Sequence, residues 1–119
     1  MSLDLSTNFG GLKLGSHIIV GSCPLTANTQ NRIAMENAGA GAVVLPSLLE
    51  EHVIAWRIRN GGSITEREQH LLDHMNRMTR GSLVPNVETY LAMLNRASVH
   101  SRIPVIASLH GGTDGFGWL

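Results

Sequence analysis

The N-terminal segment alternates apolar and polar positions with a period of two. Leu3 and Leu5 alternate with polar neighbours, and Leu12 and Leu14 resume the alternation after a Gly-Gly pair. Two glycines accept the positive φ angles of a two-residue turn. The pattern therefore predicts an antiparallel β-hairpin over residues 3–15.

Three later segments are short, apolar at successive positions and rich in β-branched residues. They are "HIIVGSCP" at 17–24, "GAVVLPS" at 41–47 and "IPVIASLHG" at 103–111, and each ends in small or turn residues. Runs that are apolar on both faces are typical of strands covered on both sides, as in parallel sheets. We therefore expect three parallel strands.

Helical patterns separate these strands. Residues 28–38 can form a helix with Thr26 or Asn28 as its N-cap and Gly39 after its last turn. A stronger pattern begins at the capping residue Asn86 and repeats apolar positions three, four and seven residues apart. Both segments are placed to connect one strand to the next.

The long segment between the second and third strands predicts two more helices. One covers residues 48–58, and another begins near Thr65, where Glu68 has capping-box spacing, and stops at Gly81. One unit of a (β/α)8 barrel takes about 31 residues. The second strand-to-strand step is about twice that length, so we interpret residues 48–81 as a helical insertion in a βα loop.

The order of elements predicts the fold class. A hairpin is followed by strand, helix, strand, helical insertion, helix and strand, which indicates an α/β fold with parallel strands and right-handed crossovers. In (β/α)8 barrels the βα loops carry the site. We therefore expect functional residues at the carboxyl ends of the three strands.

Composition narrows the function classes. Nine basic residues balance nine acidic ones, so we expect no basic face for nucleic acid or for an anionic membrane. No apolar run approaches the ~20 residues that cross a bilayer, and the N-terminus lacks the pattern of a signal peptide. Cys23 is the single cysteine, which excludes an internal disulfide and favours the cytoplasm. Lys13 is the single lysine, which excludes a P-loop and argues against a Schiff-base enzyme.

Four segments in this order resemble one enzyme family. The opening hairpin, "GSCPL", "NAGAGAVVLPSLLEE" and "IPVIASLHGG" are similar to the class 1 dihydroorotate dehydrogenases, and most of all to the bacterial dihydroorotate-dehydrogenase-like proteins. The resemblance covers residues 3–119. No single motif is specific, and the order and spacing of the motifs carry it.

The resemblance implies a fold, a cofactor and a reaction. Family members are FMN-dependent oxidoreductases on a (β/α)8 barrel, and they pass a hydride from a CH–CH substrate to the flavin. The family's hairpin closes the barrel floor, and its flavin lies across the carboxyl ends of the strands. The chain would form the first three βα units, without the family's phosphate loops and catalytic base. We therefore expect a portion of a barrel that is inactive alone and can self-associate through open sheet edges.

The resemblance also implies flavin-contacting residues on the first two strands. Ser22 and Cys23 follow the first strand, where the family's small residues approach the flavin. Burial of Cys23 as a small side chain is the alternative. Ser47 at the end of the second strand is a flavin candidate or, alternatively, a helix cap. The family's lysine falls on Pro46, so the usual cation is missing.

The third strand supplies two further candidates. His110 takes the position of a polar flavin contact, and Ser108 lies two residues earlier on the same strand face. A solvated loop histidine is the alternative reading of His110. The family's substrate-binding asparagine falls on Arg80, whereas Asn86 is explained as a helix cap.

Other chemistries have weaker support. His70 and His74 share a helix face, but no third metal ligand is placed by sequence, and a solvated face explains them. We assign no catalytic residue and no metal ligand. Two alternatives to an FMN oxidoreductase acting on a small-molecule substrate remain open: a non-catalytic fragment, and a small α/β binding domain.

Overall fold

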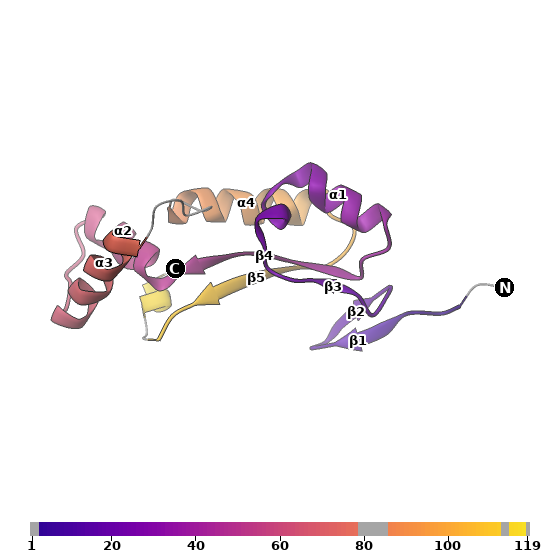
Figure 1. The fold of residues 1–119 in the computed structure, drawn as a ribbon, viewed down its shortest axis with the longest axis horizontal. Coiled ribbons are helices and arrows are strands. Elements are labelled where there is room, and N and C mark those ends of the chain that lie inside the picture. Colours follow the sequence, from indigo (N-terminus) through magenta and orange to yellow (C-terminus); the bar gives the residue numbers. More distant parts are fainter. Residues whose placement is uncertain (1–2, 79–85, 113–114, 119) are drawn as a thin grey trace. The chain divides into compact units, whose positions relative to one another are not determined.

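The computed structural model describes residues 3–78, 86–112 and 115–118, and it is a mixed α/β fold (Figure 1). Its elements are β1 (Thr7–Phe9), β2 (Leu12–Leu14), β3 (Ile19–Val20), η1 (Pro24–Ala27), α1 (Thr29–Asn37), β4 (Ala42–Leu49), α2 (Glu50–Arg59), α3 (Glu66–Met78), α4 (Val87–His100), β5 (Val105–His110) and η2 (Gly115–Trp118). The α/β class predicted from the sequence is confirmed.

The chain divides into two compact units. The first comprises Met1–Pro46 and Ala92–Ser108, and the second comprises Ser47–Leu91 and Leu109–Leu119. The predicted insertion at 48–81 falls within the second unit, except that its final three residues lie outside the described part of the chain.

The predicted hairpin is present in the first unit. Strands β1 and β2 pair antiparallel, with Thr7 opposite Leu14 and Phe9 opposite Leu12. Gly10 and Gly11 form the turn with φ angles of 54° and 82°. Both residues of the turn have positive φ, which glycine accepts without strain.

A three-stranded sheet follows, in the order β3-β4-β5. Ile19 pairs in parallel with Ala42, and Val20 pairs with Val43. Strands β4 and β5 point the same way in Figure 1, and the N–H of Val43 donates to the carbonyl of Pro104 at 3.1 Å. The parallel arrangement that the apolar runs predicted is therefore present.

The first predicted strand is shorter than expected. Only Ile19 and Val20 of the segment 17–24 enter the ladder. Pro24 begins the 3-10 helix η1 directly afterwards. Proline has no N–H to donate to a ladder and is favoured in the first turn of a helix, so the chain leaves the sheet before it.

Helices α1 and α4 lie on the same face of this sheet (Figure 1). Asn28 caps α1, with its Oδ1 accepting from the N–H of Asn31 at 3.1 Å, and Gly39 follows the helix at φ 101°. Asn86 caps α4 by accepting from the N–H of Thr89 at 2.7 Å. Sequential parallel strands with right-handed crossovers place their connecting helices on one face.

At the start of the sheet, the segment before β3 packs closely against the segment before β4. The hydroxyl of Ser16 donates to the carbonyl of Gly39 at 2.7 Å, and the N–H of Gly41 donates to the carbonyl of Ile18 at 2.8 Å. A Cβ on Gly41 would lie 2.3 Å from the carbonyl oxygen of Ser16. Glycine at 41 therefore lets the β2–β3 connection cross the start of β4.

Strand β4 is the most buried strand of the sheet, and it is longer than the sequence predicted. Its burial is nearly continuous from Ala42 to Leu48. The helix expected over 48–58 begins at Glu50 instead, because the buried apolar run extends the strand to Leu49. Strand β5 is less covered than its sequence predicted, with Leu109 54% exposed.

Helices α2 and α3 are tied together in the second unit. Arg57 forms an ion pair with Glu68, and both side chains are largely buried. Thr65 caps α3 as predicted, with its hydroxyl accepting from the N–H of Glu68 at 3.3 Å. The predicted stop at Gly81 lies outside the described residues. Within the described part of the chain, no helix is both long enough and apolar enough to span a membrane.

Candidate functional site

The five residues predicted from the sequence divide between the two units. Ser22, Cys23 and Ser108 belong to the first unit, whereas Ser47 and His110 belong to the second. Each lies near the carboxyl end of its own strand or directly after it. Each residue therefore lies at the expected position along its strand, but the five residues have different surroundings.

Ser22 and Cys23 form the link from β3 to η1. Ser22 is exposed, and Cys23 is half-buried. The carbonyl of Cys23 accepts from the N–H of Thr26 at 3.2 Å and from its hydroxyl at 2.9 Å. The backbone of Cys23 thus holds the first turn of η1, and the exposed Ser22 directly precedes it.

Ser47 and Ser108 are both half-buried strand residues. Ser47 lies inside β4, two residues before its end, and Leu49 rather than Ser47 precedes α2. The alternative reading of Ser47 as a helix cap is therefore wrong. Ser108 lies two residues before the end of β5, as predicted.

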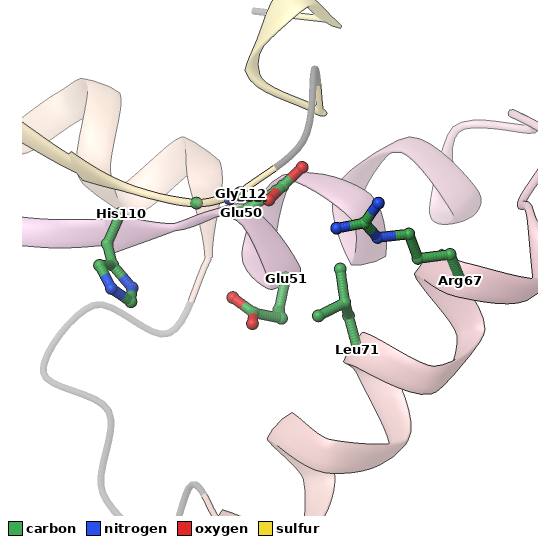
Figure 2. A pocket seen from close by; sticks show the side chains of 7 residues that line it. Glu50, Glu51, Arg67, Leu71, His110 and Gly112 are labelled. Carbon is green, nitrogen blue, oxygen red and sulfur yellow. Dashed lines mark hydrogen bonds between the residues drawn. The ribbon is translucent and has the colours of Figure 1, made fainter.

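His110 is the last residue of β5, and it lines an open cavity of about 310 Å³ in the second unit. Figure 2 shows the cavity between the start of α2, helix α3 and the segment after β5. Its other lining residues come from these same elements: Glu50, Glu51, Arg67, Leu71, Gly111 and Gly112. The exposed imidazole of His110 therefore faces a charged cavity rather than bulk solvent alone.

Glu50 ties the start of α2 to the segment after β5. Its side chain is buried, with the residue only 2% exposed. Its Oε2 accepts from the backbone N–H of Gly112 at 2.8 Å. A carboxylate at the first position of a helix is also favoured by the positive end of the helix dipole. The Glu50 side chain is therefore held at the start of α2 and against the backbone of Gly112.

At Gly111 there is no room for a side chain. A Cβ at this position would lie 2.7 Å from Oε2 of Glu50, 2.7 Å from Cε2 of Phe116 and 2.8 Å from Cβ of Glu50. Distances this short require a shift of the neighbouring atoms. The backbone after His110 therefore runs in direct contact with the Glu50 side chain.

Glu51 and Arg67 complete the charged lining. Glu51 is half-buried at the start of α2, and Arg67 is exposed in the first turn of α3. The sequence analysis did not single out Glu50, Glu51 or Arg67. The available signal was the pair "EE" directly after the second apolar run, since residues that follow a strand in a βα loop are site candidates.

His52 supports the start of α2 without lining the cavity. Its Nδ1 accepts from the N–H of Leu49 at 3.3 Å, which places the proton of the neutral ring on Nε2. Burial lowers the pKa of His52, while the negative charge of Glu51 opposes that shift. His52 is therefore a neutral capping residue of α2.

The described residues offer no metal site. No group of three or more His, Cys, Asp or Glu side chains within residues 3–78, 86–112 and 115–118 is arranged to hold an ion. His70 and His74 are exposed on α3, as the solvated-face reading expected.

Comparisons with protein-family models, with curated proteins and with solved structures found no match to this chain.

Proposed function

We propose that the chain forms the first three βα units of a (β/α)8 barrel of the class 1 dihydroorotate dehydrogenase type, and that it supplies part of an FMN-dependent oxidoreductase. The observation that carries the proposal is the single-direction sheet β3-β4-β5 with α1 and α4 on one face. A singly wound barrel has this arrangement. In the doubly wound flavodoxin-like order 2-1-3-4-5, the strand order reverses instead.

The hairpin before the sheet supports the same proposal. It precedes the amino end of β3, and Leu14 at its end is only 1% exposed. The resemblance assigns the family's hairpin to the closed floor of the barrel. If the hairpin covers the amino ends of the strands, the carboxyl ends stay open. In (β/α)8 barrels the functional site lies at the carboxyl ends.

The hydrogen-bonding groups near the strand ends are of the kind that suits the polar edge of an isoalloxazine ring. In the first unit, Ser22 follows β3 and Ser108 lies two residues before the end of β5. In the second unit, Ser47 lies two residues before the end of β4, His110 ends β5, and the backbone of Gly112 has no atom within 4 Å of a Cβ position, so a ligand can approach it closely. These groups do not form a phosphate cradle, and Pro46 stands where the family has a lysine. The fit is therefore to the ring and not to the phosphate.

FMN, when bound, supplies the hydride chemistry. The chain's own residues would position the ring and exclude water from one side of it. In the second unit, the exposed His110 is the group that would donate a hydrogen bond to a ring oxygen or nitrogen. No residue of this chain is assigned the role of catalytic base, so we expect no turnover of a small-molecule substrate by the chain alone.

A flavin titration followed by NMR tests the proposal. FMN should shift the backbone signals of Ser22, Cys23 and His110 in a saturable way. Riboflavin, which lacks the phosphate, should shift the same signals with similar affinity, because the chain contributes contacts to the ring only. His110→Ala should weaken both ligands, and His100→Ala, an exposed histidine on α4, is the matched control.

The same experiment separates the alternatives. If neither flavin shifts the strand-end signals, the oxidoreductase proposal fails and a small α/β binding domain is favoured. The observation that supports this second function is the cavity of the second unit, which described residues of that unit line by themselves. Strands β3 and β5 are the edges of the described sheet, so self-association through them remains a proposal that sedimentation can test.

A further inference from the structure

We propose that the cavity of the second unit binds a small zwitterion of the α-amino-acid class, with Arg67 holding the ligand carboxylate and Glu51 holding its ammonium group. The cavity is lined by residues at the start of α2, on α3 and after β5 (Figure 2). The proposal does not depend on flavin binding, because Glu51 and Arg67, which hold the two charges of the ligand, are not among the residues assigned to the flavin.

The first argument is the pair of opposite charges. Glu51 and Arg67 line the same cavity from different helices. Among the described residues, neither side chain forms a hydrogen bond or an ion pair, either with the other or with a third residue. Two opposite charges that share a cavity without pairing can each bind one end of a zwitterion, and a guanidinium suits a carboxylate with two parallel hydrogen bonds.

The second argument concerns Glu50, the third charged residue of the cavity. Glu50 also lines the cavity, but its Oε2 already accepts from the N–H of Gly112, and it lies at the positive end of α2. This oxygen of Glu50 is therefore already engaged within the protein. Glu51 and Arg67 supply one negative and one positive side chain to the same cavity, and the two ends of a zwitterion complement them.

The third argument is that one wall of the cavity is already formed. The hydrogen bond from Gly112 to Glu50 and the tight packing of Gly111 against the same side chain hold the segment after β5 in place. A wall that is fixed before binding does not have to be ordered by the ligand, which favours affinity. His110, at the end of this wall, adds a hydrogen-bonding side chain.

Size and polarity complete the description. The cavity volume of about 310 Å³ is at the lower end of the range for small-molecule sites. Leu71 provides an apolar surface between the charged groups (Figure 2). An amino acid with an aliphatic side chain suits this combination, because its two charges are close together and its side chain can contact Leu71.

Three matched probes test the charge assignment. L-Leucine carries both charges, 4-methylpentanoate carries only the carboxylate, and 3-methylbutylamine carries only the ammonium group. NMR titration of the full chain should show saturable shifts of Gly111 and Gly112 with L-leucine. Each single-charge analogue should bind at least about tenfold more weakly, which is the effect of losing one charge-assisted hydrogen bond.

Variants then separate the two contacts. Arg67→Gln should weaken L-leucine about tenfold and leave 3-methylbutylamine unchanged, whereas Glu51→Gln should weaken L-leucine and leave 4-methylpentanoate unchanged. Arg77→Gln and Glu66→Gln are the controls, because both residues are exposed on α3 and neither lines the cavity. Both control variants should bind L-leucine as the original chain does.

Two results would overturn the proposal. One is the absence of a saturable shift with L-leucine, and the other is equal binding of all three probes. The titration is repeated with FMN present. Leucine binding without flavin binding would support this site while the oxidoreductase proposal fails, and flavin binding without leucine binding would do the reverse.

Discussion

The side-chain Oε2 of Glu50 accepts a hydrogen bond from the backbone N–H of Gly112 at 2.8 Å. The two residues are 62 positions apart in the sequence, and Glu50 is almost completely buried. The contact joins the residue after β4 to the segment after β5. It therefore holds in place the wall of the cavity that we propose binds a zwitterion.

Loss of the Glu50 carboxylate should destabilise the chain. Glu50→Ala leaves the N–H of Gly112 without this acceptor, and we expect the free energy of unfolding to fall by about 1–3 kcal/mol. Glu50→Gln keeps an acceptor oxygen of similar reach and should lose less. Urea unfolding measures both, and equal losses in the two variants would contradict this role of the hydrogen bond.

A methyl group at position 111 should also be destabilising. In Gly111→Ala the new Cβ would lie 2.7 Å from Oε2 of Glu50, and we expect a loss of about 1–3 kcal/mol from the forced shift. Gly112→Ala is the control, since a Cβ there meets no atom within 4 Å. Thermal unfolding should show a lower midpoint temperature for Gly111→Ala than for the original chain, and an unchanged midpoint temperature for Gly112→Ala. Similar midpoint temperatures in the two variants would argue against the close packing at Gly111.

The pH dependence of stability should report on His52. Because burial lowers its pKa in the folded chain, the unfolded state takes up the proton first as the pH falls. The contribution of His52 is therefore complete above about pH 6.5 and is lost as the pH falls below that value. The slope from one group is at most about 1.4 kcal/mol per pH unit.

His52→Gln isolates this effect. A glutamine at the third helical position can accept the same hydrogen bond from the Leu49 N–H without titrating. Urea unfolding between about pH 5 and pH 8 should therefore show a flatter profile for this variant. His70→Gln, at an exposed position of α3, should keep the original profile. An unchanged profile in the first variant would exclude His52 as the source.

The buried ion pair between α2 and α3 should matter more than an exposed one. Glu68→Gln leaves the Arg57 charge, whose side chain is 8% exposed, without its carboxylate, and we expect a loss of about 3 kcal/mol. Glu88→Gln removes a pair with Arg59 in which both side chains are 57% exposed, and we expect less than about 1 kcal/mol. Urea unfolding compares the two, and equal losses would show that burial does not strengthen the first pair.

Local signals in the sequence were sufficient to place most elements. The Gly10-Gly11 turn and the caps at Asn28, Thr65 and Asn86 have the structure that they predicted, and each of the three apolar runs contributes a strand to the sheet, although the first run contributes only Ile19 and Val20. Each of these signals acts within a few residues of the chain, through backbone φ angles or one capping hydrogen bond. Boundaries that depend on burial were less accurate, as the extension of β4 to Leu49 shows.

The sequence by itself determined the α/β class and put His110 at the end of a strand. Only the tertiary structure showed that His110 shares a cavity with Glu51 and Arg67, and that Glu50 binds the backbone at Gly112. The physical reason is the range of the interactions. Strand, cap and turn preferences are set by neighbouring residues, whereas a cavity and a contact across 62 residues exist only after helices and strands have packed.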